Sequence, residues 1–324
     1  MKKTICLLIF LFPFLQSCNH PDERSKHASS KTAAEKLKFS LAQWSFNREL
    51  FAGEMTNIDF INTASKMGFE GVEYLNQFFN DKAENFEYLD SLNAAAKSAN
   101  IKNLLIMIDV DERLGASDID ERNLAVEIHK KWVSAAKYLG CSSVRINAYG
   151  DGTPDDIKDA CIESISRLAA WSQEEGVQIL IENHGGISSK GSWLVDLVKS
   201  LQQYEVGILP DFNNWCYARE NGEIWGSPCI KTYNRYKGLE ELMPYARSLS
   251  IKSLDFDDEG NETTMDYPRL IKIIKENKYD GYWGIEFEGN GMPASEGIEK
   301  TRALVKKVWN YLDPHYGIKI LNYE

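Results

Sequence analysis

The chain has 324 residues, 43% of them hydrophobic and 26% charged, a composition that is typical of a globular protein and excludes a largely disordered one. Its formal net charge is −11. Because such an acidic protein repels the phosphates of nucleic acids, nucleic-acid binding is not expected. The length suits either one large α/β barrel or two smaller domains.

The first residues have the features of an export signal. Lys2 and Lys3 precede an apolar run, residues 5–15, that is too short to span a bilayer as a stable anchor. The run ends in Leu-Gln-Ser-Cys18, which resembles the lipobox of bacterial lipoproteins, where the Cys is lipidated and becomes the new N-terminus. These features predict a signal peptide at 1–17, lipidation at Cys18 and a flexible polar tether at 18–36.

An ordinary secretory signal with a chance cysteine is the alternative at this end of the chain. If the lipobox is real, the protein is anchored by lipid to the bacterial cell envelope, at the outer membrane and facing the periplasm. Its contact with the membrane is then expected through the lipid anchor alone.

Short apolar runs alternate with amphipathic stretches from residue 37 onward. Strands are expected at 38–46, 71–75, 103–109, 142–150, 177–186, 206–214, 247–257 and 282–289. Helices are expected at 57–68, 86–99, 118–139, 154–175, 191–204, 238–246, 266–277 and 295–311. Eight strand–helix units in strict alternation predict a single (β/α)8 TIM barrel over residues 37–324. An open doubly wound sheet is the alternative, although no glycine-rich fingerprint follows the first strand.

One connection, residues 215–238, is unusually long and contains two Trp, three Tyr and a Pro. Such a loop at the carboxyl end of a barrel strand is typical of a lid or a binding loop. Packing against a neighbouring chain is the alternative. Cys216 and Cys229 share this loop, so they either pair in an oxidising compartment or remain free thiols.

Acidic residues stand at the carboxyl ends of three expected strands, where barrel enzymes place their active sites. They are Glu182 in "IENHGG", Asp211 in "PDFNN" and Glu286 in "GIEFEG". Three carboxylates at one mouth repel each other, and a divalent cation would resolve that repulsion. Of the five histidines only His184 follows a strand, so the ligand set favours an ion of the Mn²⁺ or Mg²⁺ class over zinc. Separate, ion-paired carboxylates that never meet are the alternative.

These motifs resemble the xylose isomerase-like TIM barrel family, the group of sugar phosphate isomerases and epimerases, here in a lipoprotein member. The resemblance covers essentially residues 37–312. It implies that Glu182, Asp211 and Glu286 hold one divalent metal, and that the two glutamates move protons on opposite faces of the substrate. The resemblance also implies a homodimer as one candidate assembly.

One family ligand is missing from this chain. The family has a His two residues before a Lys on the seventh strand; Lys252 is present, but Ser250 stands at the His position. Either the ion keeps three protein ligands and waters, or another residue such as His184 replaces the imidazole, or the site is metal-free. In the metal-free case Lys252 supplies the compensating positive charge.

The chemistry expected of this site is proton abstraction next to a carbonyl group, assisted by the metal or by Lys252. The expected catalytic residues are Glu182, Glu286, His184 and Lys252. The expected substrate contacts are Trp44, Glu73, Arg145, Asn147, Trp215 and Trp225. For Arg145, binding of a substrate anion and pairing within the barrel are equal alternatives, and each Trp either stacks on a sugar face or packs in the core.

Three functions agree with these features. The first is a sugar isomerase or epimerase that acts on a free sugar or sugar derivative, since export argues against a phosphorylated one. The second is a lyase or hydratase-type enzyme that acts on 3-keto-glycosides. The third is a non-enzymatic carbohydrate-binding lipoprotein. In each case the expected partner is a small-molecule carbohydrate.

Overall fold

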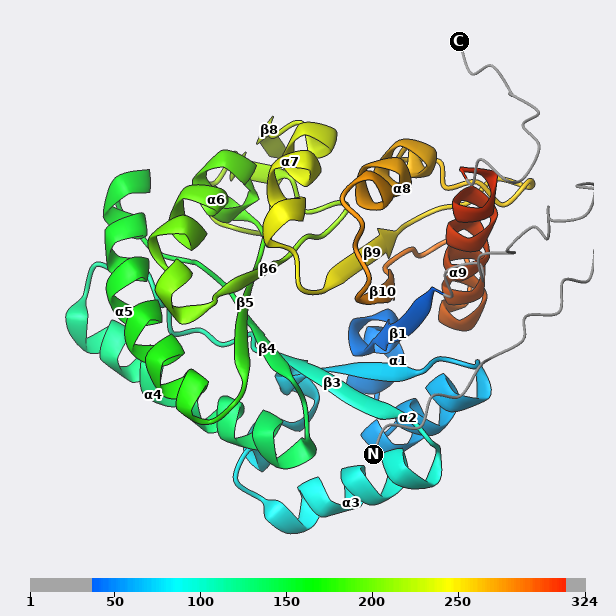
Figure 1. The fold of residues 1–324 in the computed structure, drawn as a ribbon, viewed down its shortest axis with the longest axis horizontal. Helices are drawn as coiled ribbons and strands as arrows, with labels where there is room; N and C mark the ends of the chain where they lie inside the picture. The colour runs from blue at the N-terminus through cyan, green and yellow to red at the C-terminus, as the bar shows by residue number, and fades with distance from the viewer. Residues whose placement is uncertain (1–36, 313–324) are drawn as a thin grey trace, which may run out of the picture. The chain divides into compact units, whose positions relative to one another are not determined.

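Eight parallel strands lie side by side in the computed structural model, which describes residues 37–312 (Figure 1). They are β1 (Lys38–Ala42), β2 (Gly71–Leu75), β3 (Lys102–Met107), β4 (Ser143–Ile146), β5 (Gln178–Glu182), β6 (Gly207–Leu209), β9 (Leu249–Ser253) and β10 (Tyr282–Phe287). The predicted (β/α)8 barrel is therefore confirmed. The expected signal peptide, the lipidation site Cys18 and the tether lie outside the described residues.

Helices surround the strands in the described part of the chain (Figure 1). The α-helices are α1 (Asn47–Phe51), α2 (Asn57–Lys66), α3 (Phe86–Ser98), α4 (Ile119–Leu139), α5 (Pro154–Glu174), α6 (Gly191–Ser200), α7 (Arg235–Leu242), α8 (Tyr267–Glu276) and α9 (Ala294–Tyr311). Short 3-10 turns are η1 (Gln43–Phe46), η2 (Asn76–Lys82), η3 (Gly186–Ser189), η4 (Gln202–Tyr204) and η5 (Met243–Tyr245). None of the helices in residues 37–312 combines the length and apolarity that crossing a membrane requires.

The barrel closes between β6 and β9. The other neighbours follow the order β6-β5-β4-β3-β2-β1-β10-β9. At the closure, the backbone N–H of Arg247 donates to Ile208 O at 2.9 Å and that of Ser250 donates to Pro210 O at 2.9 Å. Pro210 has no N–H to continue the ladder, which explains why regular pairing of β6 stops before it. The next bridge joins Asp211 to Ser250 and brings these two residues side by side.

Alternation along the strands divides the buried residues into two sets. One set faces the helices and forms the large outer core, and the other faces the inside of the barrel. The apolar members of the inner set are Ala42, Leu75, Leu105, Met107, Leu180 and Leu209. At the same period of two, the inner face also carries buried ionisable side chains, namely Glu73, Arg145, Glu182, Lys252 and Glu286. The barrel interior is therefore partly filled with charge.

The long connection after β6 contains a two-stranded antiparallel hairpin that the sequence did not reveal. Its strands are β7 (Cys216–Arg219) and β8 (Cys229–Thr232), and they do not join the barrel sheet. A disulfide joins Cys216 to Cys229, which settles the choice between paired and free thiols. We call residues 216–232 the hairpin below.

Trp215, an expected substrate contact, is a core residue. Its side chain is 1% exposed, and its indole Nε1 donates to Phe212 O at 2.9 Å. The ring lies against the backbone of Gly238, where an added Cβ would overlap it, and beside the ring of Tyr233 at 6.5 Å between centroids. Of the two alternatives for Trp215, packing in the core is therefore the one observed.

Glu73, another expected substrate contact, is a floor residue of the barrel. It is 2% exposed, accepts a hydrogen bond from Ser40 Oγ at 2.6 Å, and lies so close to Gly284 that a Cβ there would stand 2.7 Å from its Oε1. Burial raises its pKa to about 7, although the bond from Ser40 opposes the shift, and the charge of Glu286 raises it further. The structure therefore gives Glu73 a buried position in the barrel interior.

Replacement of Trp215 by Ala should lower the free energy of unfolding by about 3–5 kcal/mol, since it leaves a large cavity in the core. Urea unfolding followed by circular dichroism measures the change. The matched control is Trp225→Ala, because that side chain is 41% exposed and its loss should cost less than about 1 kcal/mol. Equal midpoints for the two variants would contradict the placement of Trp215.

Replacement of Glu73 by Gln should make the stability less dependent on pH. A raised pKa means that the folded chain keeps a proton which the unfolded chain loses, so the contribution of Glu73 is complete below its ordinary value of 4.5 and is lost as the pH rises through about 7. The wild type should therefore lose on the order of 3 kcal/mol relative to Glu73→Gln between about pH 4.5 and pH 8. Urea midpoints across this range test the prediction, with Glu87→Gln on the exposed face of α3 as control. Parallel profiles for wild type and Glu73→Gln would refute it.

Candidate active site

A cavity of about 590 Å³ opens at the carboxyl ends of the barrel strands. Side chains from several strand ends and from the hairpin line it, including Trp44, Asp109, Arg145, Asn147, Tyr149, His184, Trp225, Lys252, Glu286 and Glu288. Seven of the residues predicted from the sequence are thus brought together here: Trp44, Arg145, Asn147, His184, Trp225, Lys252 and Glu286. Glu182 and Asp211 are buried behind this lining, and Glu73 and Trp215 do not reach it.

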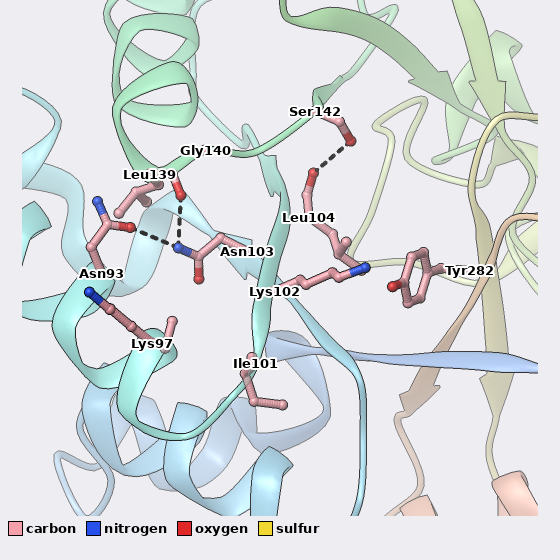
Figure 2. A pocket seen from close by; sticks show the side chains of 11 residues that line it. Asn93, Lys97, Ile101, Lys102, Asn103, Leu104, Leu139, Gly140, Ser142 and Tyr282 are labelled. Atoms are coloured by element: carbon pink, nitrogen blue, oxygen red, sulfur yellow. Dashed lines mark hydrogen bonds between the residues drawn. The ribbon is translucent and has the colours of Figure 1, made fainter.

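A second hollow, of about 480 Å³, includes the amino end of β3 (Figure 2). Its two asparagines are already paired: Asn103 Nδ2 donates to Leu139 O at 2.8 Å and to Asn93 Oδ1 at 2.9 Å. The ammonium of Lys102 lies over the ring of Tyr282, 6.0 Å from its centroid. In barrels this end serves stability rather than catalysis, so the first cavity is the candidate active site.

Lys252 lies at the centre of a carboxylate cluster. Its Nζ is 3.2 Å from Glu286 Oε1, 3.3 Å from Glu288 Oε2 and 3.4 Å from Asp211 Oδ2. Lys252 and Glu286 are direct neighbours in the register of β9 and β10, which places both side chains on the inner face. Burial alone would lower the pKa of Lys252, but the carboxylates of Asp211, Glu286 and Glu288 raise it, so the ammonium stays charged.

The hydroxyl of Ser250 joins two of these carboxylates. Its Oγ is 2.7 Å from Asp211 Oδ2 and 2.8 Å from Glu286 Oε2. A hydroxyl has one proton to donate, so both contacts are hydrogen bonds only when one carboxyl group is protonated. Burial raises the pKa of Glu286, with the charge of Lys252 opposing the shift.

Arg145 is the second buried cation. Its Nη1 donates to Asp109 Oδ1 at 2.5 Å, and its Nε lies 2.8 Å from Glu182 Oε2. Burial alone would raise the pKa of Asp109, but Arg145 holds it well below its usual range. The other oxygen of Glu182 accepts from Asn214 Nδ2 at 3.1 Å, and Asn147 Nδ2 donates to Asp109 at 2.6 Å. Of the two alternatives for Arg145, pairing within the barrel is therefore the one observed.

His184 is held in one tautomer by Tyr149. The Tyr149 hydroxyl oxygen lies 2.7 Å from His184 Nδ1 and also contacts the carbonyl oxygen of His184. Both contacts are hydrogen bonds if the hydroxyl donates to the carbonyl and Nδ1–H donates to the hydroxyl oxygen, an assignment that leaves Nε2 with a free lone pair. Burial lowers the pKa of His184 to about 3, and Arg145 adds to the shift, so the imidazole is neutral at pH 7.

Tyr149 was missed by the sequence reasoning, although a signal was present. It follows Arg145 and Asn147 at intervals of two residues, and alternation would have placed all three on one side of the chain. The sequence reasoning also assigned no role to Asp109 and Glu288, which follow β3 and β10 and line the cavity.

The hairpin covers the cavity beside His184. The Trp225 ring lies 5.0 Å from the His184 ring between centroids, and Arg219 lies over Trp225 at 5.4 Å. Gly185 permits this approach, since it has φ +92° and a Cβ there would stand 2.7 Å from Ile224 Cγ2. The expected lid is therefore a disulfide-linked hairpin that packs onto the loop after β5.

A second aromatic group, which follows β1 in the chain, also lines the cavity. Trp44 Nε1 donates to Glu288 Oε1 at 2.5 Å, which ties the indole to the carboxylate cluster. Phe51 and Phe78 pack beside Trp44, and Phe51 remains 61% exposed. The cavity thus has Trp44 and Trp225 as aromatic lining residues, both able to pack on a sugar face.

The donor set does not fit the predicted divalent-metal site. Within residues 37–312 no three His, Cys, Asp or Glu side chains are arranged to hold a metal ion. Both oxygens of Glu182 are engaged by Arg145 and Asn214. Asp211 and Glu286 share the Ser250 hydroxyl and the Lys252 ammonium. The expectation that Glu182, Asp211 and Glu286 act together as metal ligands is not supported by this arrangement.

Comparison with solved structures shows the same fold in other proteins, including a sugar epimerase. The chain is similar to the 3-keto-D-glucoside 4-epimerase of E. coli, with a TM-score of 0.62 and 14% identity over 84% of this chain and 100% of that one. It is also similar to a xylose isomerase-like TIM barrel protein from Mycobacterium smegmatis in complex with magnesium, with a TM-score of 0.61 and 14% identity over 85% of this chain and 98% of that one.

A short segment is similar to a characterised relative, the C-glycoside deglycosidase alpha subunit of Arthrobacter globiformis. The two chains are 36% identical over 67 residues, which are 21% of this chain and only 19% of that protein. The model of the family described as "Xylose isomerase-like TIM barrel" matches residues 61–308, which are most of the barrel described above. The chain therefore belongs to the xylose isomerase-like TIM barrel family.

Proposed function

We propose that the protein is a sugar isomerase or epimerase that removes a proton from a carbon next to a carbonyl group. The observation that carries this proposal is the pairing of a neutral imidazole and a buried ammonium on one cavity. His184 presents an unprotonated Nε2, and Lys252 presents a charged group that can hold a developing oxyanion.

The proposed step transfers one proton and no net electrons. Nε2 of His184 takes the proton from the carbon, and the electron pair of the broken C–H bond forms a C=C bond. The carbonyl π pair moves to oxygen, and the resulting enolate oxygen is held by the Lys252 ammonium. Return of a proton to the opposite face of the carbon gives the epimer. Glu286, whose pKa is raised by burial, lines the same cavity and is the proposed second proton source.

The cavity suits an uncharged sugar or sugar derivative better than a sugar phosphate. Arg145, the cation that would bind a phosphate, is already paired with Asp109 and Glu182. The volume of about 590 Å³ lies within the range of small-molecule sites, and Trp44 and Trp225 line it. The predicted export of the protein points to the same class of substrate.

A lyase that acts on 3-keto-glycosides is the second candidate. It is favoured by the segment that is 36% identical to a C-glycoside deglycosidase subunit. It shares the first step, because the enolate electron pair can expel a leaving group on the next carbon instead of taking back a proton. The exposed Phe51 beside Trp44 offers an apolar surface on which an aglycone could pack.

Reaction in D2O with ketoses and with 3-keto-glucosides, followed by NMR, tests the proposal. Deuterium at the carbon next to the carbonyl, together with an epimer or isomer, would support the first candidate. Release of an aglycone would support the lyase. Binding of these sugars without exchange or product would refute both, and would favour the carbohydrate-binding protein.

Replacement of His184 by Gln should reduce kcat for the substrate found in this way by about 10²–10⁴-fold, the usual contribution of a general base. In the wild type, kcat/KM should stay level from about pH 5 to about pH 8, because the base is unprotonated throughout that range.

His129→Gln is the matched control, since His129 is buried in α4, where its Nδ1 contacts Ala125 O, and does not line the cavity. Its kcat should stay within about threefold of the wild type. An inflection of kcat/KM at the ordinary histidine pKa of 6.5 would count against the assigned state of His184.

A further inference from the structure

The carboxylates for which a metal was expected already surround a cation that belongs to the chain. Lys252 Nζ lies 3.2–3.4 Å from Glu286, Glu288 and Asp211, and its side chain is 3% exposed. We propose that the Lys252 ammonium, held by the carboxylates that Ser250 links, replaces a divalent ion as the group that holds the reacting oxygen, so that this protein works without a metal. The catalytic half of this inference, that Lys252 holds the reacting oxygen, rests on the proposed function. The metal-binding half, that no divalent ion is bound, does not.

Ser250 is the residue that allows an ammonium to take the place of a metal ion. At this position an imidazole would offer a nitrogen ligand to a metal. The hydroxyl oxygen instead lies 2.7 Å from Asp211 Oδ2 and 2.8 Å from Glu286 Oε2, and so engages one oxygen of each. The remaining oxygen of Glu286 faces Lys252, and the Asp211 oxygen that bonds Ser250 also faces it. A metal at this point would have to displace both groups.

The position of Lys252 follows from strand geometry. Ser250 and Lys252 are two residues apart on β9, and both face the inside of the barrel. Lys252 is the more distant along the strand direction, so its ammonium lies nearer the mouth and lines the cavity. Because Lys252 pairs with Glu286 in the register of β9 and β10, the two residues lie at the same level along the barrel axis.

The ammonium keeps the capacity to bind substrate. Its three carboxylate contacts are all 3.2 Å or longer, whereas a strong charge-assisted hydrogen bond is about 2.7–2.9 Å. Three N–H donors held at such distances are not saturated and can shorten onto an incoming oxyanion. In a site shielded from water this interaction is much stronger than in bulk solvent.

The charge of Lys252 also opposes a metal. A divalent ion beside a charged ammonium is repelled, and displacement of the ammonium requires either its movement or its deprotonation. The three carboxylates are therefore already neutralised in part, without an external ion.

Titration of the wild-type protein with Mn²⁺ after exhaustive dialysis against a chelator tests the metal-binding half directly. Isothermal calorimetry and the EPR signal of free Mn²⁺ should show no saturable site, and thermal unfolding should not shift with Mn²⁺. Where a substrate has been found, activity after chelation should stay within about twofold of its starting value. One tightly held Mn²⁺ per chain, or activity that returns only with added metal, would overturn the proposal.

A double variant tests whether Lys252 occupies the position of the metal. The double variant Ser250→His/Lys252→Met frees the carboxylates and supplies an imidazole, so it should gain a Mn²⁺ site and a Mn²⁺-dependent rise in unfolding temperature. Lys237→Met, which removes a 63%-exposed side chain on α7, should behave like the wild type. A double variant that is folded by circular dichroism and still binds no Mn²⁺ would contradict the assignment of the metal position to Lys252. Since the wild-type titration needs no variant, a misfolded double variant leaves the test intact.

The catalytic half has its own readout. Lys252→Met should lower kcat by about 10²–10³-fold, as loss of an oxyanion donor does, with a smaller change in KM. Lys252→Arg keeps the charge and should recover part of kcat. Equal loss in both variants, or a loss confined to KM, would contradict a role in holding the oxyanion. If no sugar reacts with the wild type, the proposed function fails, while the Mn²⁺ titrations still decide the metal question.

Discussion

Two buried cations pair with most of the carboxylates of the barrel interior. Lys252 and Arg145 each stand between carboxylates from neighbouring strands, and a buried charge is tolerated only with such partners. The strands fix the spacing of these pairs, because inward-facing positions recur every two residues and parallel register sets their height. The electrostatics of the site is therefore part of the barrel rather than of its loops.

This arrangement assigns different work to residues that look alike in sequence. Glu182 and Asp109 hold Arg145, and Asp211 binds Ser250 and Lys252, so these carboxylates position the cations. His184 lies apart from the ion pairs, and Tyr149 leaves one of its nitrogens free. A neutral imidazole and a fixed positive charge therefore line the same cavity.

The sequence predicted the architecture well, because eight repeats of a strand–helix pattern leave few alternatives. It placed strand ends less well: the expected strands 177–186 and 206–214 end at Glu182 and Leu209, since the polar residues that follow make loop contacts. Trp215 and Trp225 could not be told apart, because burial of an indole depends on distant partners such as Gly238. The ion pairs of Lys252 join residues more than 30 positions apart, and only the change from His to Ser at 250 hinted at them.

The disulfide of the hairpin constrains only a short segment of the chain. It joins residues 13 positions apart, both within the cover of the cavity, so it restricts the hairpin and leaves the barrel core untouched. Reduction would thus be expected to act on the residence time of a bound sugar and on the order of Trp225, while the fold persists. The same polypeptide would have a tight entrance in an oxidising envelope and a loose one in a reducing cytosol, which makes the compartment of synthesis a determinant of how selective the cavity is.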